Sequence, residues 1–127
     1  LIECPWLSRF VNSYIAVAIG GSIGALLRFT ISEWVGTPQA TLLVNAAGSL
    51  LLGICMAALT NEMISKEMTI FVGTGILGAF TTMSTFSVET IELWNENNAT
   101  AIGYVLITML FCPILAYTGW RAVESIA

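Results

Sequence analysis

The chain alternates between long apolar stretches that carry no charge and short segments that hold nearly all the charged residues. The uncharged stretches cover residues 11–27, 34–61, 68–88 and 97–120. Each is close to or above the ~17–25 residues that a helix needs to cross a bilayer core. The pattern predicts four transmembrane helices, at about 12–32, 39–60, 68–94 and 99–121. The connections are too short for a second domain, so residues 1–127 should form one all-α domain embedded in the membrane.

Composition supports this prediction and excludes several functions. Hydrophobic residues make up 57% of the chain and charged residues 9%, which is far more apolar than a soluble domain of this size. The net charge of −4 comes without a block of like charge, so no nucleic-acid partner is expected. The absence of His and Asp removes the usual general bases, and we expect no enzyme. Cys4, Cys55 and Cys112 lack paired spacing and are expected to be packing residues.

The charges that flank the stretches specify orientation only weakly. Four spans place both termini on one side, together with Arg9, Lys66 and Arg121, while Arg28 lies near the other side. This small bias fits insertion in both orientations as well as one fixed topology. Residues 1–13 lack a basic region leading into an apolar core with a cleavage site, so no cleaved signal peptide is expected.

The first span carries a face of small residues that ends in a cation. Ala16, Gly20, Gly24 and Arg28 recur every four residues and therefore share one side of a helix. Small residues at this spacing let membrane helices approach closely, which predicts a packing seam. The Arg28 guanidinium either reaches out to the interface or turns inward to polar groups in the bundle.

Polar residues inside the second and fourth spans need partners. Asn45 stands among apolar residues, and either another helix or a wet cavity could supply its hydrogen bonds. Tyr104, Thr108 and Cys112 lie four apart and give one side of the fourth helix two hydroxyls and a thiol. This side could line a polar track.

The third span is a poor continuous helix. Glycine weakens helix interiors, and clustered Ser and Thr compete for backbone hydrogen bonds. Both occur here, as Gly73, Gly75, Gly78, Thr81, Thr82, Ser84, Thr85 and Ser87. One interpretation is an unwound stretch around residues 78–82, whose freed carbonyls would make a cation site. The other is an intact helix whose hydroxyls bond back to the preceding turn.

The polar groups of these spans offer hydrogen-bond donors, which suit a small, strongly hydrated anion such as fluoride. The donors are Asn45, Ser84, Thr85, Tyr104 and Thr108. Four helices of this size pack around side chains and enclose no channel, so transport needs either a partner chain or large rocking motions. A dimer is the simpler of the two. Two oppositely inserted copies would supply the inverted repeat that larger transporters encode in one chain.

Three motifs, in order, resemble those of the CrcB/Fluc fluoride channels. They are Gly20-Gly-x-x-Gly-Ala-x-x-Arg28, Thr41-Leu-x-Val-Asn45-x-x-Gly48 and Gly78-x-x-Thr-Thr-x-Ser-Thr-Phe-Ser87. The segment Tyr104-Val-Leu-Ile-Thr108 is similar to the polar track of the fourth span in that family.

The resemblance implies an antiparallel, dual-topology homodimer in the cell membrane that exports fluoride and confers fluoride resistance. It also implies a structural sodium ion at the dimer centre, bound by the backbone carbonyls of Gly78 and Thr81. The residues implied along the fluoride pathway are Asn45, Met83, Ser84, Thr85, Phe86, Tyr104 and Thr108. Met83 departs from the family, which has a phenylalanine there. A thioether lacks the electropositive edge of a ring, so Met83 cannot make the contact implied for that phenylalanine.

Two charged residues remain open. Arg28 and Glu89 are expected in a vestibule or in a structural polar role, although Glu89 could also mark the water interface as Glu92 and Glu96 do. The main alternative function is a proton-coupled exporter of the small multidrug resistance kind, which needs a membrane-buried carboxylate. The first span has Arg28 and no acid, and Glu89 is the only substitute, near a span edge. A non-conducting assembly subunit is a third possibility.

Overall fold

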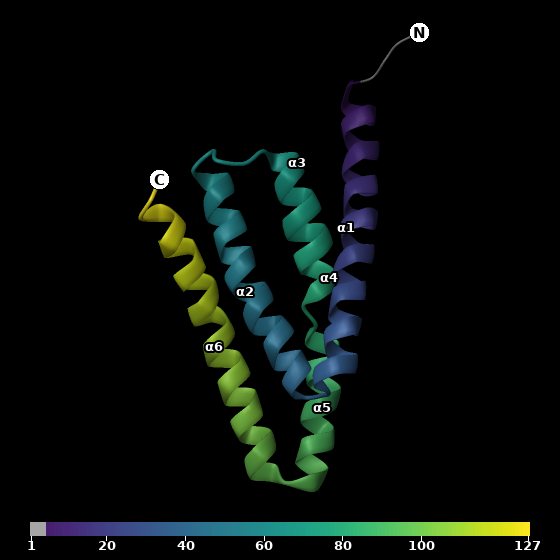
Figure 1. Ribbon diagram of the computed structural model, residues 1–127, viewed down its shortest axis with the longest axis vertical. Coiled ribbons are helices and arrows are strands. Elements are labelled where there is room, and N and C mark those ends of the chain that lie inside the picture. The colour runs from purple at the N-terminus through teal and green to yellow at the C-terminus, as the bar shows by residue number, and fades with distance from the viewer. Residues whose placement is uncertain (1–4) are drawn as a thin grey trace.

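The computed structural model describes the backbone of residues 5–127 and the side chains of residues 12–127. Every regular element in that range is a helix (Figure 1). The elements are α1 (Pro5–Val35), α2 (Gln39–Thr60), α3 (Lys66–Thr69), the π-helix η1 (Ile70–Leu77), α4 (Gly78–Phe80), α5 (Met83–Glu96) and α6 (Asn98–Glu124). Four segments are long and apolar enough to cross a membrane, namely Asn12–Val35, Gln39–Thr60, Lys66–Glu96 and Asn98–Glu124. The prediction of an all-helical, multi-pass membrane protein is confirmed. Cys4 lies outside the described residues, and the absence of a signal peptide stays a prediction.

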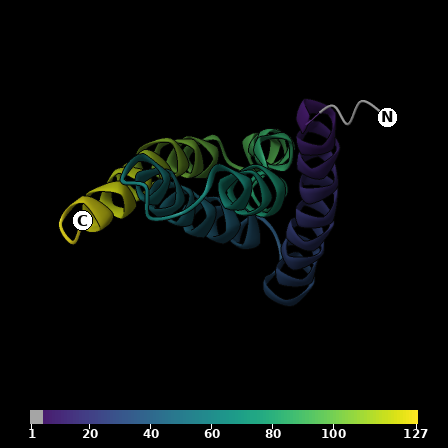
Figure 2. The ribbon, with the colours of Figure 1, turned by 90° about the horizontal axis from the view of Figure 1, so that it is seen from above.

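The first part of the third segment packs against α1, and its last part packs against α6, which also pairs with α2. α2 runs along α6, while α1 runs along η1 and α4, and α5 packs against the first part of α6 (Figure 1). Seen from above, the third segment lies between α1 on one side and the α2 and α6 pair on the other (Figure 2). The start of α1 and the end of α6 lie at the same end of the bundle, together with the connection from α2 to α3.

Local signals mark where the helices end. Gly36 follows α1 with a φ of +79°, the left-handed conformation that glycine adopts at low cost, and its N–H donates to the Ser32 carbonyl at 3.0 Å. Asn97 begins α6 by accepting from the N–H groups of Ala99 and Thr100, at 2.9 and 3.1 Å. The two turns therefore form from their own residues.

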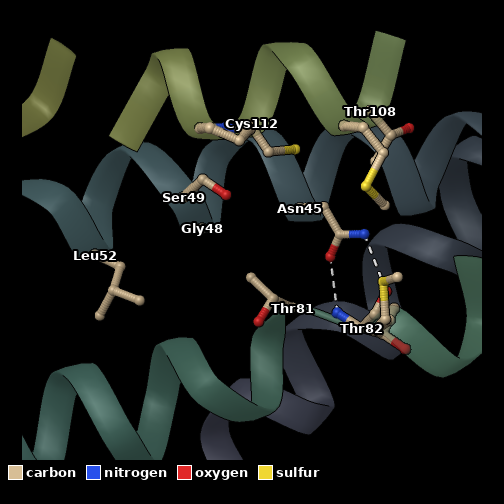
Figure 3. Close-up of a pocket in the computed structure, with 11 residues that line it drawn as sticks. Asn45, Gly48, Ser49, Leu52, Thr81, Thr82, Thr108 and Cys112 are labelled. Atoms are coloured by element: carbon tan, nitrogen blue, oxygen red, sulfur yellow. Dashed lines mark hydrogen bonds between the residues drawn. The ribbon is translucent and has the colours of Figure 1, made fainter. Parts of the chain in front are cut away.

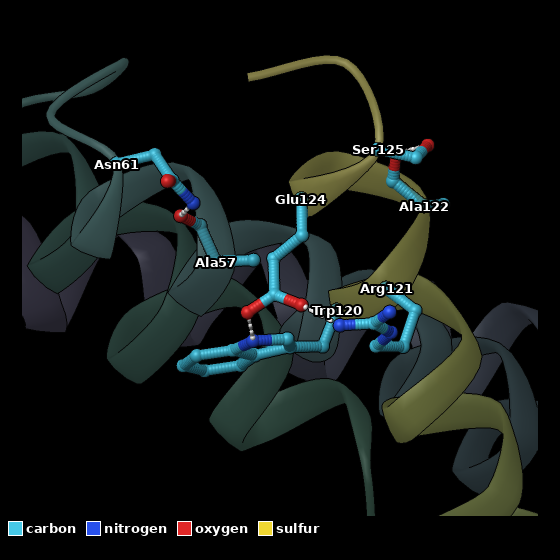
Figure 4. A network of polar contacts seen from close by, with 7 residues as sticks. All are labelled: Ala57, Asn61, Trp120, Arg121, Ala122, Glu124 and Ser125. Carbon is cyan, nitrogen blue, oxygen red and sulfur yellow. Dashed lines mark hydrogen bonds and ion pairs between the residues drawn. The ribbon is translucent and has the colours of Figure 1, made fainter.

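The last turn of α6 carries a polar network at its exposed surface (Figure 4). The Glu124 carboxylate accepts from the Trp120 indole N–H at 2.7 Å and from Arg121 at 2.6 Å. Trp and Arg are enriched where membrane helices meet water. Because the ion pair is exposed, it adds little stability, and we interpret the network as marking the membrane–water boundary of α6.

The predicted glycine seam is the contact between α1 and the third segment. A Cβ atom added to Gly20 would lie 2.6 Å from the Phe71 carbonyl oxygen, and one added to Gly24 would collide with the Ile76 carbonyl. Backbone therefore touches backbone along this face. The small residues permit the close approach that brings η1 and α4 against α1.

The third segment is helical as far as Phe80 and becomes helical again at Met83. Between them Thr81 has φ −80° and ψ 155°, and Thr82 has φ −148° and ψ 117°, both in the extended region. Gly78 has helical angles of −63° and −35°. The backbone thus leaves the helical conformation at Thr81 and Thr82, a shorter stretch than residues 78–82, and Asn45 binds it at Thr82.

We predict that Gly24→Ala destabilises the protein by about 1–3 kcal/mol, the usual cost of inserting a methyl group into a filled contact. Unfolding of the detergent-solubilised protein in sodium dodecyl sulfate, followed by circular dichroism, measures this change. Gly103→Ala is the matched control, because nothing lies within 4 Å of the added Cβ. Equal stability of the two variants would contradict a tight seam.

Candidate functional site

The side chain of Asn45 holds the non-helical backbone of the third segment (Figure 3). Its Nδ2 donates to the Thr82 carbonyl at 3.0 Å, and its Oδ1 accepts from the Thr82 N–H at 2.7 Å. The amide therefore pairs with both polar groups of one extended residue, as a neighbouring β-strand would. This answers the question that the sequence left open, because the partner of Asn45 is the backbone of another segment.

Side chains at the break take the N–H groups that two carbonyls would accept in a continuous helix. In a continuous helix the Thr82 N–H would donate to the Gly78 carbonyl, but here it donates to Asn45. The Thr85 N–H would likewise donate to the Thr81 carbonyl, but it donates to the Thr82 hydroxyl at 3.2 Å. Gly78 and Thr81, the residues predicted for sodium, thus lose the amides that a continuous helix would give their carbonyls.

Arg28 turns inward and binds a third carbonyl beside the break. Its Nε donates to the Ala79 carbonyl at 3.2 Å, and the side chain is partly buried. Ala79 lies in the last helical turn before Thr81, where carbonyls lack intrahelical partners and the helix dipole favours a cation. Arg28 is therefore a polar group of the bundle interior, one of the two placements that the sequence allowed.

Hydroxyl groups gather at the start of α5. The Thr82 hydroxyl caps this helix and donates to the Thr85 hydroxyl at 2.9 Å. The Ser84 hydroxyl lies 3.3 Å from the Thr82 hydroxyl. Helix geometry leaves the N–H groups of Met83 and Ser84 without intrahelical acceptors. The start of α5 consequently presents N–H and O–H donors together at the positive end of a helix.

Glu89 lies inside the bundle and binds two hydroxyls. Its side chain is only 5% exposed, and its two oxygens accept from Thr41 and from Tyr104, each at 2.7 Å. The ring of Tyr104 also contacts that of Phe86, with centroids 5.1 Å apart. Glu89 therefore lies in the bundle interior and accepts from two hydroxyls, whereas Glu92 is exposed.

Thr41 is the residue of this site to which sequence reasoning gave no role. It belongs to one of the quoted motifs and stands four residues before Asn45, on the same face of α2. That spacing was the available signal. A threonine hydroxyl inside a helix often bonds to the backbone of its own preceding turn, so the spacing alone could not identify Glu89 as its partner.

A cavity of about 300 Å³ opens between α2, the break and α6 (Figure 3). Asn45, Thr82, Met83 and Thr108 contribute to its wall. Among the described residues the Thr108 hydroxyl has no hydrogen-bond partner, although the residue is only 4% exposed. A buried hydroxyl without a partner costs free energy, so Thr108 is an exception among the buried polar groups of the described residues.

The structure therefore divides the predicted pathway residues among three places. Asn45, Met83 and Thr108 line the cavity, whereas Ser84 and Thr85 lie at the start of α5. Phe86 and Tyr104 are buried next to Glu89 and do not line the cavity. These placements leave the roles of the individual residues as predictions.

Comparison with known proteins agrees with the motifs. Residues 15–120 match the family model described as "CrcB-like protein, Camphor Resistance (CrcB)". The chain belongs to the CrcB family. The match spans all four membrane segments in part or in full, and the resemblance predicted from the three motifs is confirmed.

Several proteins of this family are similar to the chain over most of its length. The "Fluoride-specific ion channel FluC" of Thermotoga petrophila is 42% identical over 84% of this chain and 90% of that protein. "Fluoride-specific ion channel FluC 2" of Bacillus subtilis is 44% identical over 84% of this chain and 83% of its own length. The "Fluoride-specific ion channel FluC" of Shewanella sp. strain ANA-3 is 39% identical over 91% of this chain and 98% of that protein.

We predict that Asn45→Ala destabilises the protein by about 1–3 kcal/mol, because it leaves the polar groups of Thr82 without partners. Amide hydrogen exchange at Thr82 should accelerate, which mass spectrometry of the peptide spanning the break measures. Asn61→Ala is the control, because Asn61 bonds only to the Ala57 carbonyl of its own helix (Figure 4). Unchanged exchange at Thr82 in the Asn45 variant would refute the stabilising role of the Asn45–Thr82 hydrogen bonds.

Proposed function

We propose that this protein is a fluoride channel that exports fluoride across the cell membrane. The observation that carries the proposal is the 42% identity, over 84% of the chain, with a protein named as a fluoride-specific ion channel. The cavity chemistry supports it. Fluoride holds its water tightly, so a conducting site must replace that water with closely spaced donors.

The donors near the cavity are the right kind for a small anion. Asn45 carries two amide protons and gives one to Thr82, which leaves the other for an anion. Thr108 adds a buried hydroxyl, and the start of α5 adds the N–H of Met83 and the positive end of a helix. No carboxylate is among the residues that line this cavity, so no carboxylate charge there repels an anion.

Met83 is where this chain departs from the family pattern. The side chain is 62% exposed in the single chain and lines the same cavity as Asn45. A thioether is polarisable and flexible, but it has no electropositive ring edge to offer an anion. In our proposal the anion at this position depends on Asn45 and Thr108, with Met83 as a flexible wall.

We further propose that two copies insert with opposite orientation and form an antiparallel dimer. A single chain leaves the cavity wall at Met83 exposed, and it leaves Gly78 exposed beside the break. A second copy related by a two-fold axis in the membrane plane would cover both and would bring the two breaks together. The break would then lie at mid-membrane depth, where non-helical backbone must be buried or line a cavity.

The sodium ion belongs to the same proposal. Gly78 and Thr81 offer carbonyls that have lost the amides of a continuous helix, and carbonyl oxygen is a suitable ligand for a hard monovalent cation. These donors fit the ion. If bound there, it would offset the negative ends of the carbonyl dipoles from both copies and hold the two breaks in register. Arg28 binds the neighbouring Ala79 carbonyl and so leaves these two for the ion.

Purified protein in liposomes loaded with potassium fluoride should release fluoride when valinomycin allows charge to be balanced. A fluoride electrode measures the release, and liposomes loaded with chloride are the control. Release that needs valinomycin identifies an electrogenic channel. Drug transport driven by a proton gradient, without fluoride release, would favour the exporter alternative and contradict the channel.

We predict that Thr108→Val separates stability from transport. Valine has nearly the same shape and removes a buried hydroxyl without a partner, so stability should stay equal or rise by about 1 kcal/mol. Fluoride release should fall, because the cavity loses a donor. Thr118→Val is the control, since that hydroxyl is exposed and bonds to the Ile114 carbonyl of its own helix. Unchanged release in Thr108→Val would remove this residue from the pathway.

A further inference from the structure

Three sulfur-containing side chains line the cavity beside the break. Met83, Met109 and Cys112 all contribute to its wall, one from the first turn of α5 and two from α6. Met109 and Cys112 stand three residues apart on one helix, which places their Cβ atoms about 5–6 Å from each other. Cys112 lies on α6, across from Asn45 on α2 (Figure 3). Two thioethers and a thiol thus share a space of about 300 Å³.

These side chains are not ordinary core residues. Met83 is 62% exposed and Met109 is 42% exposed, and Cys112 is half-buried, whereas Cys55 is buried. A methionine side chain has three rotatable bonds, so a thioether that is not tightly packed can turn toward a ligand at low cost. In the single chain these three residues are therefore less tightly packed than Cys55.

We propose that this cavity is a binding site for a soft monovalent metal ion, Cu(I) or its redox-inert analogue Ag(I). The ligands are the Cys112 thiolate and the Met83 and Met109 thioethers. Soft thiolate and thioether ligands select Cu(I) over hard ions. No carboxylate lines the cavity, so it lacks the anionic oxygen ligand that calcium and magnesium sites usually contain.

Binding of the metal needs the thiolate. The Cys112 S–H bond breaks, its proton passes to buffer, and the sulfur lone pair forms the bond to the metal, so one proton is released for each ion bound and no electron is transferred. Met83 and Met109 donate lone pairs and complete the coordination. This site differs in chemistry from the proposed sodium site, which uses carbonyl oxygens.

The test is silver binding to the full chain in detergent, without chloride or thiol reductants, in a Cys4→Ser background. Equilibrium dialysis with silver nitrate should find one tight Ag(I) per chain. Cys112→Ser should abolish tight binding. Met83→Leu and Met109→Leu should each weaken it by about tenfold or more, the loss that even an outer-shell partner of a metal can cause. The controls Cys55→Ala and Met68→Leu should bind as the parent does, because neither residue lines the cavity.

X-ray absorption at the silver edge gives a second measurement, in which a shell of sulfur atoms alone is expected. Tight binding that survives in Cys112→Ser, or that is lost equally in Cys55→Ala, would overturn the site. Affinity that is unaffected by both leucine variants would do the same, because silver would then be reacting with a simple thiol. The proposal goes beyond fluoride transport and is measured without it, so either can fail alone.

Discussion

The pairing of the Asn45 amide with the Thr82 backbone is the contact on which the rest of the site depends. Two hydrogen bonds, of 3.0 and 2.7 Å, satisfy a residue whose backbone is extended between two helices. In a membrane no water is at hand to satisfy such groups, and each one left alone would cost several kcal/mol. The Asn45 amide therefore stabilises the interruption of the helix, and it takes the N–H that the Gly78 carbonyl would accept in a continuous helix.

Other polar residues complete the arrangement around the interruption. Arg28 binds the Ala79 carbonyl before it, and the Thr82 hydroxyl caps the helix that follows. Farther along α5, Glu89 accepts hydrogen bonds from Thr41 of α2 and Tyr104 of α6. These bonds connect both helices to the third segment at a second place. Nearly every polar side chain of this region is thus used to hold structure. The Thr108 hydroxyl stands out because it has no partner among the described residues.

Close packing of α1 makes these contacts possible. Gly20 and Gly24 let the backbone of α1 touch that of the third segment, which brings the Arg28 side chain within reach of Ala79. Without a hydrophobic driving force between helices in lipid, such close van der Waals contact is a main source of association. The packing seam and the polar site are therefore linked. The small residues permit the close approach of the helices, and Arg28 then bonds across that contact.

The sequence by itself determined the four apolar segments, the small-residue face of α1 and the family, because hydropathy, helical spacing and short motifs are local properties of the chain. It also singled out the third segment as a poor helix, from its glycines and hydroxyls. Only the tertiary structure decided that Asn45 binds Thr82, 37 residues away, and that Thr41 binds Glu89, 48 residues away. A polar side chain in an apolar span indicates that a hydrogen-bond partner is needed. Which residue is that partner depends on which helices lie side by side. That is set by packing over the whole chain, and no local pattern records it.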